Sequence, residues 1–220
     1  MLLFKYLPPE RVDVLSSLRL RFTPLISMND PFEHTLRIGT KEYAIDSDPT
    51  MLRVEPTAFV SLSRNNSNIL MWSHYAESHK GFCIGFKRNN TYFSKAESVR
   101  YRRYRSHLNG MSIDLFPKDP NLKGISLEKA IDWAYEEEER LFLCDVEKDL
   151  LNVGVDEWGQ PITLNTYPHS SIAAIYLGMR ASDDLKIQVK EALKRNSLDI
   201  PIYKAKKCID QFALEFELCT

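Results

Sequence analysis

The 220-residue chain is 44% hydrophobic and carries 29 Lys and Arg against 30 Asp and Glu. This apolar content is enough for one sizeable core and excludes a largely disordered chain. The balanced charge gives no global electrostatic reason for nucleic acid or an anionic membrane as an obligate partner. We therefore expect a single domain over residues 1–220.

No stretch of the sequence approaches 18 uninterrupted apolar residues, and the first residues lack the features of a signal peptide. The sequence thus predicts a cytoplasmic protein without a membrane partner. Its cysteines, which lack the paired spacing of a zinc site, predict buried thiols and no metal: Cys83, Cys144, Cys208 and Cys219.

The N-terminal part predicts a strand at 2–7, a helix at 8–18 that begins with prolines, and a second strand at 19–25. The sequence SMNDPFE at 27–33 predicts a sharp turn. Residues 40–56 have no strong periodicity and several acidic and proline residues, and they predict a loop with a short helix.

The clearest local signal is a strand at 57–63, a helix at 67–79 and a strand at 81–87. Residues 98–106 alternate Arg with Tyr and predict an edge strand, in which the charges protect the edge or contact phosphate. An irregular connection is expected at 106–124.

The C-terminal half predicts further elements in mixed order. They are a helix at 126–137, a strand at 139–146, a loop or hairpin at 155–164, a strand at 171–178, a helix at 182–197 capped by Ser182, and a strand or hairpin at 201–218. About four helices and seven to nine strands in this order predict a single α+β domain with mixed, mostly antiparallel sheets.

Two short segments place polar groups together. Asn29, Asp30 and Glu33 lie in the SMNDPFE turn, where they either hydrogen-bond the backbone or contact a substrate or metal. Ser61 and Ser63 share one face of their predicted strand, so their hydroxyls can hold a polar ligand or simply border an edge.

Trp72, Tyr75 and His79 form one stripe of the predicted helix. Such a stripe packs in the core or contacts a ligand.

Four carboxylates follow one another in YEEEER at 135–140. If the strand begins early, Glu136, Glu138 and Arg140 share one face, and the crowding raises a carboxyl pKa toward acid or base use. The alternative is a solvated charge run.

Longer motifs carry a resemblance. These are Phe4-Lys5-Tyr6, MNDPFE at 28–33, LMWSHYAESHKGFCIGF at 70–86, and Trp133 with YEEEERL at 135–141. In this order they resemble the bacterial domain-of-unknown-function family 2971, over nearly the whole chain. The resemblance implies a shared fold and site, and an effector role in abortive-infection phage defence.

The layout is also similar to that of ADP-ribosyltransferases, which have a strand-helix-strand start, a central Ser-x-Ser strand and a carboxylate at the head of a later strand. Arg21, Ser61-Leu62-Ser63 and Glu136-Glu137-Glu138 stand at these places. The sequence departs from that pattern in lacking an N-terminal His-Gly-Thr and in having Ser-Leu-Ser.

This similarity implies NAD as cofactor, with a protein or nucleic-acid target. It implies Glu138, Glu136 and Ser61 as catalytic residues. Tyr6 or Trp72 would stack on nicotinamide and Arg21 would pair with pyrophosphate. The full set expected to bind the cofactor is Tyr6, Arg21, Asn29, Ser63, Trp72 and Tyr75.

Two other functions are open at this point. One is a sensing module without catalysis, which binds a ligand or protein through the aromatic stripe around Trp72. The other is a metal-dependent nuclease that uses Asp30, Glu33, Glu136 and Glu138.

Overall fold

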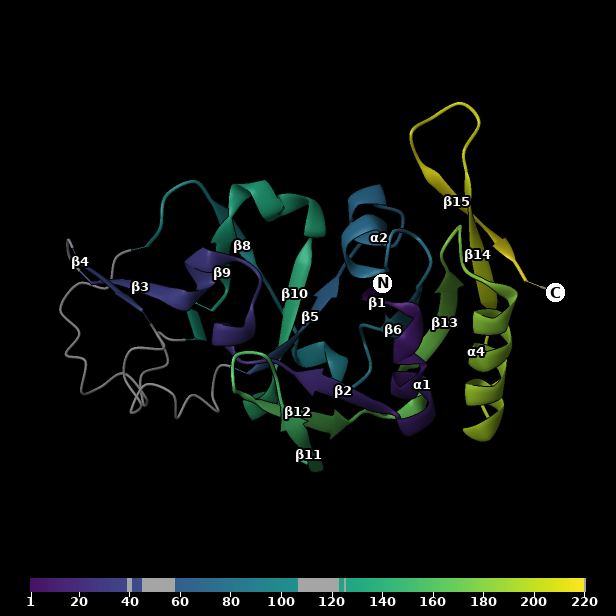
Figure 1. Ribbon diagram of the computed structural model, residues 1–220, viewed down its shortest axis with the longest axis horizontal. Coiled ribbons are helices and arrows are strands. Elements are labelled where there is room, and N and C mark those ends of the chain that lie inside the picture. Colours follow the sequence, from purple (N-terminus) through teal and green to yellow (C-terminus); the bar gives the residue numbers. More distant parts are fainter. Residues whose placement is uncertain (39–40, 45–57, 107–122, 125, 220) are drawn as a thin grey trace.

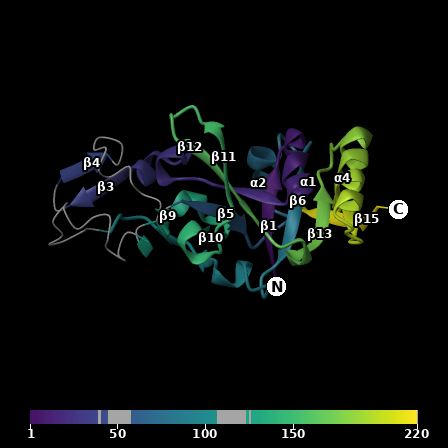
Figure 2. The same ribbon diagram turned by 90° about the horizontal axis from the view of Figure 1, so that it is seen from below.

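The computed structural model describes residues 1–38, 41–44, 58–106, 123, 124 and 126–219. Within these residues the molecule is elongated, with β3 and β4 at one end and α4, β14 and β15 at the other (Figures 1 and 2). No helix in the described ranges combines the length and the apolar character needed to cross a bilayer.

Most described strands belong to one eight-stranded sheet (Figure 1). In spatial order the strands are β15 (Leu214–Leu218), β14 (Ile202–Lys207), β13 (Ile172–Leu177), β6 (Phe82–Lys87), β1 (Leu2–Leu7), β5 (Phe59–Ser63), β10 (Glu138–Phe142) and β7 (Glu97–Ser98). Neighbouring strands are antiparallel, except that β13 and β14 are parallel.

Three smaller sheets complete the described strands. They are β11 (Leu150–Val155) with β12 (Pro161–Thr166) and β2 (Arg19–Phe22), then β3 (Thr35–Ile38) with β4 (Lys41–Ala44), and the parallel pair β8 (Arg100–Arg102) and β9 (Glu128–Ala130).

The described α-helices are α1 (Asp13–Ser17), α2 (Ile69–Tyr75) and α4 (Asp183–Arg195). Short 3-10 segments lie at Pro9–Val12, Leu25–Ser27, Pro31–His34, Phe93–Lys95, Ile131–Glu136, Leu143–Asp145 and His169–Ser171. The predicted α+β class with mostly antiparallel sheets is therefore confirmed.

Apolar side chains cover both faces of the large sheet, because alternate residues of a strand point to opposite faces. Leu3 of β1 joins a cluster that includes Leu15 of α1 and Val189 of α4. Phe4 and Tyr6 join a second cluster with α2. The helices thus pack on opposite sides of β1.

The large sheet is joined at its middle by a single residue pair. Phe4 of β1 lies opposite Ser63 of β5, whereas β1 and β6 are paired over their whole length. β1 and β5 therefore separate beyond this pair, and the sheet divides into two parts.

The predicted helix at 126–137 is wrong. This segment forms β9, which pairs with β8, and then the 3-10 segment Ile131–Glu136. Its apolar spacing is typical of a helix, but Ile131 is exposed and Lys129 is buried. Ion pairs made by Lys129 override the local preference.

Two predicted loops are described only in part. Residues 40–56 were predicted to contain no strand. This prediction is wrong for Lys41–Ala44, which form β4. Residues 45–56, and residues 107–122 of the second predicted connection, lie outside the described residues.

Candidate functional site

A cavity of about 330 Å³ lies where β1 and β5 separate. Its walls come from β1, β2, β5, α2, β9, and the segments before β3 and β10. Its lining includes Lys5, Tyr6, Arg21, Ser27, Asn29, Ser61, Ser63, Tyr75, Lys129, Glu136 and Glu138. A cavity of this size accommodates part of a nucleotide.

Two adjacent strands supply its polar wall. Ser63 lies opposite Glu138, and Ser61 lies opposite Arg140. Because alternate residues share a face, the two serines, Glu138 and Arg140 form one group on the cavity side of the sheet. Glu139 lies on the other face, where its carboxylate accepts a 2.8 Å hydrogen bond from Nε of Arg88.

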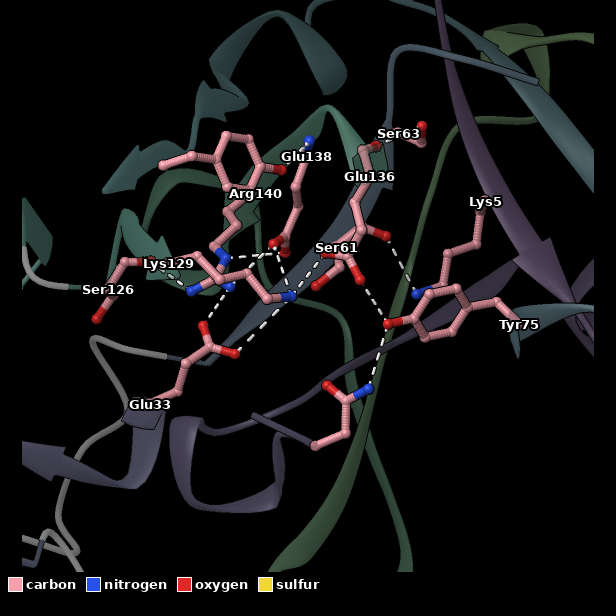
Figure 3. A network of polar contacts seen from close by, with 12 residues as sticks. Lys5, Glu33, Ser61, Ser63, Tyr75, Ser126, Lys129, Glu136, Glu138 and Arg140 are labelled. Carbon is pink, nitrogen blue, oxygen red and sulfur yellow. Dashed lines mark hydrogen bonds and ion pairs between the residues drawn. The ribbon is translucent and has the colours of Figure 1, made fainter. Parts of the chain in front are cut away.

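The fully buried guanidinium of Arg140 organises the group (Figure 3). It donates to both carboxylate oxygens of Glu138, at 2.8 and 2.9 Å, and it also donates to Glu33. A further bond of 2.6 Å reaches the carbonyl oxygen of Ser126, and the guanidinium lies 4.2 Å over the ring of Phe59.

Lys129 of β9 is the second buried cation. Its Nζ lies 2.6 Å from Glu136, 3.4 Å from Glu138 and 4.0 Å from Glu33. The hydroxyl of Tyr75 donates to the other oxygen of Glu136 at 2.5 Å and accepts from Asn29 at 3.2 Å. The three carboxylates are thus held in fixed orientations (Figure 3).

These contacts determine the charge of Glu138. Burial by itself raises the pKa of a carboxyl group, but Arg140 and Lys129 outweigh it and lower the pKa of Glu138 to about 2, with help from a Ser61 hydrogen bond. Crowding by neighbouring carboxylates therefore does not prevail at Glu138, because Arg140 on the same face keeps the group ionised. This residue is ionised at neutral pH and is suited to stabilise positive charge.

Lys5 also lines the cavity, although the sequence did not predict it as a site residue. Its Nζ donates to the carbonyl oxygen of Ser61 at 3.1 Å. Burial lowers the pKa of Lys5 to about 8, although the carboxylate of Glu138 opposes the shift. The one sequence signal was a lone lysine within the apolar strand LLFKYL. Near neutral pH, Lys5 has an appreciable uncharged fraction that can accept a proton.

Eight of the nine predicted site residues line this cavity. They are Tyr6, Arg21, Asn29, Ser61, Ser63, Tyr75, Glu136 and Glu138. Their chemical roles stay predictions. Two have evident structural partners, since Tyr6 donates to the carbonyl oxygen of Asn65 and the Ser63 hydroxyl donates to that of Glu136.

Arg21 is held at one side of the cavity. Its guanidinium donates to Asp156 at 2.6 Å, and Asp156 also accepts from Ser27 at 2.7 Å. Asp156 therefore already balances the charge that was expected to pair with pyrophosphate. A pyrophosphate group would have to share Arg21 with this carboxylate.

Trp72 does not line the cavity, so the expected stacking of its indole on a ligand is not supported. The side chain is fully buried, meets the ring of Tyr6 edge-on at 5.1 Å, and donates to the carbonyl oxygen of Asn66. A large apolar ring gains more from this packing than from a wet cavity. The predicted stripe is thus divided: Trp72 packs in the core, Tyr75 lines the cavity, and His79 lies beyond α2, which ends at Tyr75.

The acids expected for a nuclease converge around cations. Glu33, Glu136 and Glu138 surround Lys129, and Arg140 also binds two of them. In the part of the chain that the structure describes, no group of three His, Cys, Asp or Glu side chains is placed to hold a metal ion. The geometry therefore does not favour the nuclease interpretation.

Residues 71–141 match the model of a family described as Protein of unknown function (DUF2971). The resemblance inferred from the sequence motifs is confirmed over this segment, which contains Tyr75, Glu136 and Glu138. Neither the curated proteins nor the solved structures contain a match to the chain.

Proposed function

We propose that this chain is a glycosyl-transferring enzyme that binds the nicotinamide riboside end of NAD in the cavity and transfers ADP-ribose. The observation that carries the proposal is an ionised carboxylate, Glu138, fixed in the wall of a cavity lined by hydroxyl, amide and aromatic groups. Ser61 lies on the adjacent strand β5, and Tyr6 lies on β1 beyond it, so both border the same cavity as Glu138.

The chemistry requires a negative charge close to the ribose. The bond between ribose C1 and the nicotinamide nitrogen breaks, and its electron pair leaves with nicotinamide. Positive charge then builds on the ribose, where Glu138 stabilises it. The acceptor forms a bond with C1 and loses a proton, and Lys5 in the same cavity can take this proton.

Nicotinamide release from NAD tests the proposal. Glu138→Gln removes the charge and keeps the shape, so we expect release to fall by about 100-fold or more. Glu139→Gln changes the neighbouring carboxylate on the opposite face and should retain the wild-type rate. Melting temperatures measured with and without NAD report binding separately from chemistry.

Ser61→Ala provides a second variant if Glu138→Gln folds poorly. It removes one hydroxyl next to Glu138, and a fall in nicotinamide release with an unchanged melting temperature would support a role in the reaction. No release by the wild-type protein, together with no protection of its melting temperature by NAD, would refute the proposal. Protection without release would support the sensing module instead.

The phage-defence setting is part of the same proposal and is supported by the family resemblance. We expect toxicity on expression in bacteria, and Glu138→Gln should relieve it while Glu139→Gln should not.

A further inference from the structure

A second cavity, of about 420 Å³, lies on the other side of the buried ionic group. Lys129 lines both cavities. Asp30 and Glu33 line the buried part of the second cavity, with apolar contacts from Leu25 and Ile131. Three arginines, Arg102, Arg103 and Arg105, also line it.

Asp30 and Glu33 line this cavity, and each has one buried carboxylate oxygen without a hydrogen-bond donor among the described residues. Asp30 is 1% exposed: its Oδ1 accepts from the backbone of Phe32 at 2.9 Å, and its Oδ2 is unpaired. Glu33 is 7% exposed: its Oε1 binds Arg140, and its Oε2 has no hydrogen bond, with Lys129 Nζ 4.0 Å away. Unpaired buried carboxylate oxygens are costly, so a ligand that supplies donors would relieve both.

The net charge of the buried ionic group also favours a positively charged ligand. Among the described residues, the four buried carboxylates Asp30, Glu33, Glu136 and Glu138 stand against the buried cations Lys129 and Arg140, with Lys5 as a third cation that acts on Glu138 from the first cavity. Burial raises the pKa of Glu33, which reflects its incomplete compensation. A positive group that entered beside Asp30 and Glu33 would balance this excess.

We propose that the second cavity binds a small organic zwitterion through a guanidinium or ammonium head group. The head group donates to Oδ2 of Asp30 and Oε2 of Glu33, and the apolar walls contact its methylene chain. Arg102 is paired with Glu128 and Arg105 donates to Thr35, so the exposed Arg103 is the arginine that favours an anionic group at the other end of the ligand, because guanidinium groups form bidentate hydrogen bonds with carboxylates. This proposal does not depend on NAD binding in the first cavity.

Free L-arginine is the probe, and citrulline is its matched control, because citrulline has nearly the same shape without the positive charge. Isothermal titration calorimetry on the full chain should show arginine binding at least about 10-fold more tightly than citrulline, as expected for charged hydrogen bonds. Equal affinities for the two compounds, or no heat from arginine at millimolar concentration, would overturn the proposal.

Asp30→Asn tests the site itself. Asparagine keeps the oxygen that accepts from Phe32 and replaces the unpaired oxygen by a donor. Arginine should bind at least about 10-fold more weakly, while the ligand-free melting temperature does not fall, because an unpaired charge has been removed. Asp132→Asn changes an exposed residue of the same cavity and should bind arginine like the wild type.

Wild-type affinity in Asp30→Asn would place the binding elsewhere and refute the assignment. If Asp30→Asn does not fold, the comparison of arginine with citrulline on the wild-type protein still decides the outcome.

Discussion

Glu138 and Glu139 are neighbours in the sequence, but they have opposite environments. Glu138 faces the cavity and two cations, whereas Glu139 faces the other side of the sheet and binds Arg88. Strand alternation was sufficient to separate the two. Strand alternation does not explain the position of Glu136, because Glu136 precedes the strand and reaches the same ionic group from a 3-10 segment.

Apart from Arg140, the cations of the site were harder to predict than its carboxylates. Lys5 lies far from Glu138 in the sequence, and Lys129 lies nine residues before Glu138 in a segment predicted as a helix, so strand alternation relates neither lysine to Glu138. Their positions follow from which strands pair, and strand pairing depends on the whole fold. Residue patterns therefore identified eight residues of the cavity lining and placed Arg140 beside Glu138, but they did not identify Lys5 or Lys129.

The pair formed by Glu139 and Arg88 leads to a prediction about stability. Arg88 also donates to the carbonyl oxygens of Phe93, Ser94 and Ala96, so it fastens the segment after β6 to β10. Glu139→Gln leaves this arginine without its carboxylate and should lower the free energy of unfolding by about 1–3 kcal/mol. Urea denaturation measures the change.

Nicotinamide release by Glu139→Gln should stay at the wild-type rate, measured well below the melting temperature. A variant as stable as the wild type would show that the buried pair contributes little to folding.

Among the elements, those whose contacts are local were predicted well. The helix at 182–197 was expected to begin after Ser182, and the side chain of Ser182 does accept from the backbone of Leu185 at 3.1 Å. Its apolar face is regular, with Leu185, Val189 and Leu193 buried. The segment 126–137 has similar spacing, but Glu128–Ala130 pairs with the distant strand β8 and Lys129 is buried, so tertiary pairing overrides the helical spacing.

Substitutions at Ser182 test how much the N-cap of α4 contributes to stability. Ser182→Ala removes the acceptor for a backbone N–H in the first helical turn and should lower the free energy of unfolding by about 1 kcal/mol. Ser182→Asp restores an acceptor and should recover most of this loss. Thermal unfolding followed by circular dichroism compares the three proteins. An equally large loss in both variants would mean that the hydroxyl is not acting as a cap.

On the scale of the whole molecule, the buried ionic group joins segments that are distant in the sequence. Glu33 precedes β3, Lys129 belongs to β9, and Glu138 and Arg140 belong to β10. Tyr75 connects α2 to the same group through Glu136. The interaction network therefore links both cavities to the central sheet, and protonation of Glu138 within it should weaken the entire fold.

The pH dependence of stability follows from the pKa of Glu138. This pKa is about 2 in the folded protein against an ordinary value of 4.5, so folding favours the ionised form. The resulting stabilisation is fully present above about pH 4.5 and is lost as the pH falls toward 2. Its size is on the order of 3 kcal/mol. Glu33 acts in the opposite sense, because burial raises its pKa and acid then relieves an unpaired charge.

Urea midpoints measured from pH 6 to pH 3 should therefore fall for the wild-type protein. Glu138→Gln should start from a lower stability, because Arg140 and Lys129 lose a partner, but its midpoint should fall less steeply over the same range. Glu33→Gln should lose more than the wild type on acidification, since it lacks the group that acid relieves. If Glu138→Gln and the wild type lost stability in parallel, Glu138 would not be the carboxylate that links the ionic group to acid unfolding.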